Sequence, residues 1–183
     1  MKFNYFSKYF ETISEALMSI DSTELESAAV MVWETHKSSK KIIIAGNGGS
    51  AAMASHVAVD FTKAAGIRAI NFNEADLITC FANDYGYEHW VVKALEAYAD
   101  LGDLVILISS SGKSPNIVKG AEKAKNMGLS VITFSGFLSD NILRKLGDLN
   151  LWVDSSEYNI VEMSHHVWLV AIIDYLTHQN KGA

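Results

Sequence analysis

The chain of 183 residues has only one cysteine, the residue that forms disulfides, and only one proline, the residue that interrupts helices and strands. The single cysteine, Cys80, excludes an internal disulfide and is typical of a protein kept in a reducing compartment. Runs of Lys or Arg are also missing, and the formal net charge is −6. Broad nucleic-acid binding depends on neutralising phosphates, so we expect no nucleic-acid partner.

Long uncharged stretches are missing as well. Lys8, Glu11 and Glu15 interrupt the apolar residues near the N-terminus, which therefore does not match a secretory signal. No stretch elsewhere is long and apolar enough to predict a membrane span, so we expect no membrane partner. Hydrophobic residues make up 49% of the chain, enough for a sizeable core. We predict one domain over residues 1–183, located in the cytoplasm.

Helical and strand-like patterns alternate along the chain. Strand-like runs occupy residues 41–45, 68–72, 104–109, 130–134 and 149–153, and helical patterns occupy residues 50–64, 86–99, 114–127, 138–146 and 159–178. This alternation predicts an α/β fold in which helices cover both faces of a parallel sheet. In such a sheet, ligands bind at the carboxyl ends of the strands.

An N-terminal helical extension, about residues 1–38, precedes the first strand. Its first helix carries apolar residues at alternating spacings of three and four, which form a narrow seam for packing against another helix. These residues are Phe3, Phe6, Phe10, Ile13, Leu17 and Ile20. Asp21 with Glu24 resembles a capping pair that starts a second helix, running to about Lys37. The last helix is apolar all round, so we expect a homo-oligomer that covers both surfaces.

Two loops rich in glycine and serine follow predicted strands, and each opens a helix. They are Ala45-Gly46-Asn47-Gly48-Gly49-Ser50 and Ser109-Ser110-Ser111-Gly112-Lys113-Ser114. Glycines let the backbone approach an anion, hydroxyls donate hydrogen bonds, and a helix N-terminus supplies free N–H groups. Ser114 is a natural N-cap, and Pro115 suits the first helical turn. The loops predict a phosphate site.

Two other interpretations of these loops stay open. Gly46, Gly48 and Ala51 match the G-x-G-x-x-G/A fingerprint of dinucleotide-binding folds. That fold favours an acidic residue at the end of the second strand. The nearest candidate, Glu74, comes after the end of the predicted strand at 68–72. Tight turns alone would explain the glycines but not the polar side chains after the strand at 104–109. We therefore expect phosphate binding and no nucleotide cofactor.

Taken in order, four motifs resemble the sugar isomerase (SIS) domain family and, within it, the bacterial phosphoheptose isomerases. The motifs are Gly46-Asn47-Gly48-Gly49-Ser50, His56, Asn83-Asp84-Tyr85-Gly86-Tyr87-Glu88 and Ser109-Ser110-Ser111-Gly112-Lys113-Ser114. The resemblance implies a flavodoxin-like three-layer sandwich around a five-stranded parallel sheet, assembled as a homotetramer with active sites between subunits. It assigns phosphate and substrate binding to Ser109, Ser110, Ser111, Ser114, Asn47, Gly48 and Ser50, and the sugar hydroxyls to Asn83 and Asp84.

The isomerase chemistry moves a proton between C1 and C2 of the sugar through an enediolate, which requires a base and a group that stabilises the oxyanion. Phosphoheptose isomerases carry His-x-x-x-Glu on one helix, and Gln and His eight residues apart on the last helix, for zinc binding and proton transfer. This chain keeps His56 and has Asp60 at the glutamate position. The alignment puts Val161 at the glutamine and Leu169 at the histidine.

The helical period offers a replacement for the two missing polar residues. Residues four apart share a helical face, so His165 lies one turn from both Val161 and Leu169. We predict that His56, Asp60 and His165 converge as a zinc site, with Asp60 and His165 as catalytic residues. His166 points about a hundred degrees away and is the weaker candidate. The alternatives are a structural His56–Asp60 pair and an interface histidine.

These expectations lead to a ketose–aldose isomerase that acts on a phosphorylated sugar. The resemblance implies conversion of sedoheptulose 7-phosphate to D-glycero-D-manno-heptose 7-phosphate. One alternative is a non-catalytic module that binds phosphosugars or a replication initiator, because the family also contains tetramers that regulate replication initiation. Another is a dinucleotide-dependent enzyme, which a titration with nucleotide separates from the other two.

Overall fold

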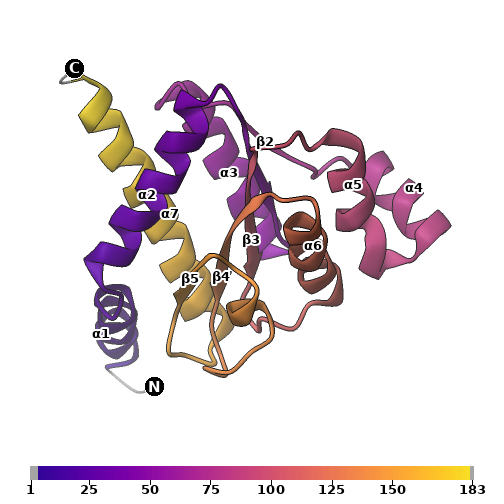
Figure 1. The fold of residues 1–183 in the computed structure, drawn as a ribbon. Coiled ribbons are helices and arrows are strands. Elements are labelled where there is room, and N and C mark those ends of the chain that lie inside the picture. The colour runs from indigo at the N-terminus through magenta and orange to yellow at the C-terminus, as the bar shows by residue number, and fades with distance from the viewer. Residues whose placement is uncertain (1–3, 182–183) are drawn as a thin grey trace.

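The computed structural model describes residues 4–181 and contains one five-stranded sheet in the order β2-β1-β3-β4-β5 (Figure 1). The strands are β1 Ile42–Ala45, β2 Ala69–Asn71, β3 Leu104–Ser109, β4 Ser130–Ser135 and β5 Leu149–Trp152. Every neighbouring pair is parallel. The predicted α/β fold is confirmed, and the strand order is that of flavodoxin-like sheets.

Helices cover both faces of this sheet (Figure 1). They are α1 Tyr5–Met18, α2 Ser22–Lys37, α3 Gly49–Lys63, α4 Ala75–Tyr85, α5 Trp90–Tyr98, α6 Pro115–Asn126 and α7 Tyr158–Lys181, with short 3-10 helices η1 Tyr87–His89 and η2 Leu143–Lys145. The helices α2, α3 and α7 pack on one face, and α5 and α6 pack on the other. Across residues 4–181, no helix has the length and apolarity that crossing a membrane requires.

The strands are apolar on both faces because both faces are buried. Side chains alternate along β1, so Ile42 and Ile44 join the core under α2, α3 and α7, while Ile43 and Ala45 join the core under α5 and α6. All residues of the central strand β3 are buried. Burial on two sides is the reason that these strands read as continuous apolar runs rather than as alternating patterns.

Two predicted helices differ from the observed elements. The helix expected over 86–99 is shorter, since η1 and α5 replace it, and the separate helix α4 precedes it unpredicted. The helix expected over 138–146 is wrong, because only the 3-10 turn η2 forms there. Asn141 fixes that segment as a loop: its side chain donates to Leu138 O at 2.8 Å and accepts from Arg144 N at 2.9 Å.

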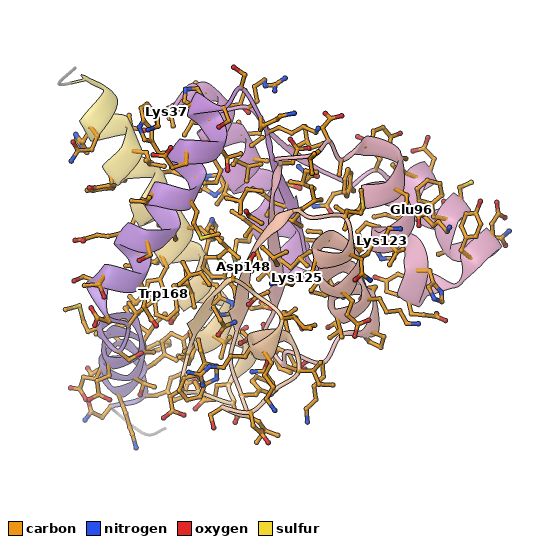
Figure 2. All side chains as sticks on the ribbon, viewed as in Figure 1. Lys37, Glu96, Lys123, Lys125, Asp148 and Trp168 are labelled. Carbon is orange, nitrogen blue, oxygen red and sulfur yellow. The ribbon has the colours of Figure 1, made fainter. Side chains whose placement is uncertain are left out.

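The N-terminal seam packs over only part of its length. Phe3 lies outside the described residues, whereas Leu17 and Ile20 pack against the core. Trp168 of α7 donates its indole N–H to Leu17 O at 3.0 Å, which joins α1 to α7 (Figure 2). Phe6 and Phe10 stay exposed, at 72% and 61%. Their rings contact those of Tyr5 and Tyr9 on the same helix, so the aromatic half of the predicted seam lies at the surface of the described residues.

Candidate active site

The two Gly/Ser loops meet where the strand order reverses. The chain leaves β1 towards the edge strand β2 and leaves β3 towards β4, so the loops diverge and open a crevice between them. A cavity of about 300 Å³ lies in this crevice. Its lining residues are Asn47, Gly48, Gly49, Ser50, Ile108, Ser109, Ser110, Ser111, Ser114, Tyr158 and Glu162. The structure thus brings both predicted loops to one cavity.

The first loop contributes backbone N–H groups as well as the side chains of Asn47 and Ser50 to this cavity. Gly48 adopts a positive φ of 54°, a conformation that favours glycine, and it is the N-cap of α3. Gly46 has to be glycine for a different reason, since a Cβ atom there would lie 2.6 Å from Ser50 Cβ. Within residues 4–181, no hydrogen bond takes up the N–H groups of Gly48 and Gly49. These donors at the start of α3 suit an anion.

The second loop presents hydroxyl groups. Ser109 and Ser114 pair through their Oγ atoms at 3.0 Å, and Ser111 Oγ accepts from Lys113 N at 3.3 Å. Ser110 Oγ is buried and has no hydrogen-bond partner in the part of the chain that the structure describes. A buried hydroxyl without a partner is costly, so this group is well placed to donate to a bound anion.

Ser114 departs from one detail of the prediction. It occupies the N-cap position of α6, but its side chain makes no capping hydrogen bond. The hydroxyl turns instead towards Ser109 at the end of β3. Ser114 therefore contributes to the floor of the cavity rather than to the start of the helix.

Asn47 joins the two loops. Its side-chain amide exchanges two hydrogen bonds with Asn116 of α6, both at 2.9 Å, and its Oδ1 also accepts from Tyr87 Oη at 3.0 Å. Asn116 is buried, so this contact fixes the spacing of the loops. Asn47 holds the cavity open in one geometry and retains one amide N–H for a ligand.

Asn83 and Asp84 do not reach the cavity within one chain. Both are exposed on the last turn of α4, where Asn83 Nδ2 donates to Asp84 Oδ1 at 3.0 Å. The helix α4 follows the edge strand β2 and lies beyond α5, away from the sheet (Figure 1). Motif order along the chain did not predict this separation in space.

The predicted convergence of His165 with His56 and Asp60 is wrong. His165 is fully buried between the rings of Phe134 and Trp168, and its Nε2–H donates to Ser135 O at 3.0 Å. Burial lowers the pKa of His165 to about 4, so the ring is neutral near pH 7. His165 belongs to the core and lines neither the cavity nor a metal site.

His166 takes the place that His165 was expected to hold. His56 Nδ1 lies 2.8 Å from His166 Nε2, and His56 Nε2 lies 3.1 Å from Asp60 Oδ2. Burial, together with the nearby His56, lowers the pKa of His166. The face of α7 that meets α3 is the one that carries residue 166, which the helical period alone could not determine.

The three residues His56, Asp60 and His166 lie beside a second, mostly apolar cavity of about 380 Å³, called the groove here. It is lined by His56, Met163, His166, Val167, Val170, Ala171 and Asp174. Over the described range 4–181, no group of three or more His, Cys, Asp or Glu side chains is placed to hold a metal ion. Both ring nitrogens of His56 are already engaged by protein neighbours, so the predicted zinc ligands do not form a site within one chain.

The two positions that the resemblance assigns on the last helix do not face the cavity. Val161 and Leu169 are both fully buried core residues, and a Cβ atom on Gly136 would lie 2.7 Å from Val161 Cγ1. The next positions, Glu162 and Val170, face the cavity and the groove. The two residues of α7 that are eight apart and line these two spaces are therefore Glu162, in the cavity, and Val170, in the groove.

Glu162 lines the cavity but was not among the residues predicted from the sequence. A signal was present, because Glu162 is the only Asp, Glu, Lys or Arg between Tyr158 and Ile173. An isolated charge on an apolar helix is rarely buried without a function. The structure places it in the same cavity as the Gly/Ser loops.

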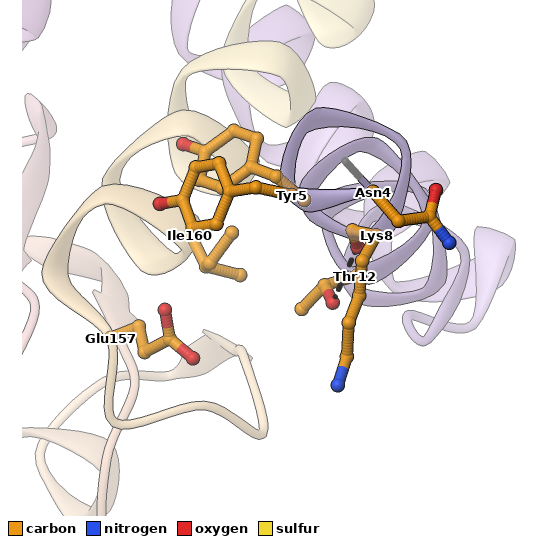
Figure 3. Close-up of a pocket in the computed structure, with 7 residues that line it drawn as sticks. Asn4, Tyr5, Lys8, Thr12, Glu157 and Ile160 are labelled. Carbon is orange, nitrogen blue, oxygen red and sulfur yellow. Dashed lines mark hydrogen bonds between the residues drawn. The ribbon is translucent and has the colours of Figure 1, made fainter. Parts of the chain in front are cut away.

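A further cavity, of about 390 Å³, lies between α1 and the start of α7 (Figure 3). Lys8, Thr12, Glu157 and Ile160 are among its lining residues. It shares no lining residue with the cavity at the Gly/Ser loops. Glu157 is thus a second carboxylate near the start of α7 that faces a different space.

A model of the SIS domain matches residues 4–136, which include both Gly/Ser loops. The chain belongs to the SIS domain family. This SIS domain chain is 35% identical to the phosphoheptose isomerase of Campylobacter concisus, covering 98% of this chain and 96% of that relative. It is 31% identical to the phosphoheptose isomerase of Helicobacter pylori, covering 96% and 95%.

Solved structures agree with this assignment. The phosphoheptose isomerase of Neisseria gonorrhoeae superposes with a TM-score of 0.86 at 27% identity, covering 94% of this chain and 95% of that one. A phosphoheptose isomerase from Francisella tularensis shares the fold, with a TM-score of 0.89 over 98% of this chain and 99% of that chain, at 23% identity.

Proposed function

We propose that this SIS domain protein is a phosphosugar isomerase that interconverts a ketose phosphate and an aldose phosphate. The observation that carries the proposal is the cavity between the two Gly/Ser loops, which combines free helix N-terminal N–H groups, serine hydroxyls and one carboxylate. A phosphate is a good ligand for the first two, and the carboxylate supplies acid–base chemistry. Relatives of nearly equal length are named phosphoheptose isomerases.

The substrate that we propose is sedoheptulose 7-phosphate, and the product is D-glycero-D-manno-heptose 7-phosphate. In the proposed complex, Ser109, Ser110, Ser111 and Ser114 hold the phosphate, and Gly48 lines the same cavity. Asn47 and Ser50 complete the wall of the cavity. Hydrogen bonds to a charged phosphate are stronger than those between neutral groups, so these contacts fix the sugar at its phosphate end.

We propose a homotetramer as the active assembly. The exposed Phe6 and Phe10 on α1, and the exposed Met163 and Val167 on α7, are large apolar side chains that favour a partner surface. Asn83 and Asp84 are exposed and bind sugar hydroxyls in this proposal only from a neighbouring subunit.

Zinc takes no part in the proposed reaction. Its expected ligands were His56, Asp60 and His165, and the last of these is tied to Ser135 in the core. His56 lines the groove and pairs with Asp60, and neither residue lines the cavity between the Gly/Ser loops. The cytoplasmic location stays part of the proposal, supported by the exposed free thiol of Cys80.

The direct test is conversion of substrate. Purified protein incubated with sedoheptulose 7-phosphate should produce an aldoheptose 7-phosphate, detected by NMR from its anomeric protons. Parallel incubations with hexulose and pentulose phosphates define the length of sugar that the cavity accepts. Binding of these sugars without conversion of any of them would favour the non-catalytic phosphosugar-binding module instead.

A further inference from the structure

Among the described residues 4–181, Glu162 is the only one with a carboxylate or imidazole that lines the cavity between the Gly/Ser loops, called the phosphate cavity from here on. It is half-buried, and burial raises the pKa of its carboxyl group. Within residues 4–181, no hydrogen bond or ion pair joins this carboxylate to another residue, and desolvation is the sole cause of its pKa shift. Structural carboxylates in such surroundings are normally paired, so Glu162 has no evident role in holding the fold together.

The neighbouring backbone leaves room for this carboxylate. A Cβ atom on Gly49, the first residue of α3, would overlap the carboxylate of Glu162. Glu162 therefore lies on the α3 and α7 side of the cavity, while the serines after β3 form another wall. A phosphate dianion and a carboxylate repel each other, so a bound phosphosugar is expected to place its phosphate at the serines and its carbonyl end towards Glu162.

This inference rests on the proposed function and deepens it. We propose that Glu162 is the general base that carries the proton between C1 and C2 of the bound phosphosugar. Its carboxylate removes a proton from C1 of the open-chain ketose, and the electrons of the C1–H bond form the C1–C2 double bond as the carbonyl electrons move to O2. The proton on O1 passes to the adjacent O2, and protonated Glu162 then returns its proton to C2, which gives the aldose.

The step balances without an outside oxidant, reductant or metal, because the sugar gives one proton to Glu162 and takes one back. Protonated Glu162 can exchange its proton with solvent in between, so the returned proton carries the solvent label. A base must reach the proton that it removes, and within one chain the other predicted bases, Asp60 and His165, do not line the cavity. His165 is enclosed in the core, and Asp60 pairs with His56, which lines the groove. The carboxylate of Glu162 lines the cavity, and no ion pair or hydrogen bond with residues 4–181 lowers its basicity.

The test measures solvent deuterium incorporation into sedoheptulose 7-phosphate by Glu162→Gln and by the matched control Glu157→Gln. The amide keeps the shape of Glu162 but cannot accept the proton, so its exchange rate should fall by roughly two to four orders of magnitude. Its affinity for inorganic phosphate should stay the same or rise, because a negative charge has left the cavity. Glu157→Gln should exchange at the wild-type rate, since Glu157 faces the cavity between α1 and α7.

Two further variants separate position from charge. Gly49→Ala keeps the carboxylate but pushes it aside, so exchange should fall while the urea midpoint of unfolding stays near that of the wild type. Asp60→Asn removes the rival base and should keep exchange within about tenfold of wild type. If Glu162→Gln exchanged deuterium at the wild-type rate, or if only Asp60→Asn lost exchange, the role of Glu162 would be overturned. The isomerase proposal would still stand. Absence of exchange in the wild-type protein would overturn both.

Discussion

Acid should destabilise this protein through His165. Folding lowers the pKa of His165 from the usual 6.5 to about 4, because the ring is enclosed by Phe134 and Trp168 and cannot be hydrated when charged. The unfolded chain therefore binds this proton more tightly than the folded chain does. The stability that neutral His165 contributes is fully present above pH 6.5 and is lost as the pH falls from 6.5 towards 4.

The size of the effect follows from the shift. Over the whole window, the free energy of unfolding should fall by about 3 kcal/mol, and between pH 7 and pH 5 by about 2 kcal/mol. Urea unfolding at the two pH values, followed by tryptophan fluorescence, measures this difference. His165→Leu should lose much less stability over the same interval, because it has no proton to bind. Ser135 O keeps a partner in that variant, since it also accepts from Val153 N at 2.9 Å.

A matched control is available on the same helix. His178 is exposed on α7, so His178→Gln should lose stability on acidification to the same extent as the wild type. Equal losses in the wild type and in His165→Leu would refute the reasoning, because the proton taken up on unfolding would then belong to another group.

Other predictions concern the loops, the assembly and the metal. Ser111→Ala should weaken phosphosugar binding by about 1 to 3 kcal/mol in calorimetry, and an unchanged affinity would contradict the phosphate assignment. Gly112→Ala should destabilise the second loop, because φ is 64° and a Cβ atom would overlap Asn141. Gly48→Ala has open space beside it, so thermal unfolding should show only the backbone strain of φ 54° and ψ −121°, about 1 to 3 kcal/mol. Phe10→Glu puts a charge on the exposed seam and should dissociate the oligomer in sedimentation, whereas a wild-type monomer would contradict the proposed assembly. Removing metal with a chelator should leave the exchange rate unchanged, and a large loss restored by zinc would contradict the metal-free step.

The sequence predicted the sheet and its loops well because their signals are local. Buried parallel strands are short apolar runs, and the Gly/Ser loops stand at their carboxyl ends, so their meeting point follows from the topology. The helix α4 was missed, and η2 was overestimated as a full helix. In the second case, the Asn141 side chain replaced helical hydrogen bonds with loop contacts.

The site on α7 could not be predicted in the same way. An all-round apolar helix does not reveal which of its faces meets the sheet and which meets α3, so His165 was predicted where the structure places His166. The position of Asn83 and Asp84 depends on how α4 leaves the edge of the sheet, which no local pattern encodes. In contrast, Glu162 stands out in the sequence once an isolated charge on an apolar helix is treated as a site residue.

The central claim is that this SIS domain protein forms an enediolate from a phosphosugar. The most direct measurement is NMR of sedoheptulose 7-phosphate incubated with the wild-type protein in D₂O. Deuterium should enter at C1 of the ketose and at C2 of the aldose product, even when net conversion is slow. Tight binding of heptose, hexose and pentose phosphates with no deuterium in any of them would contradict the account.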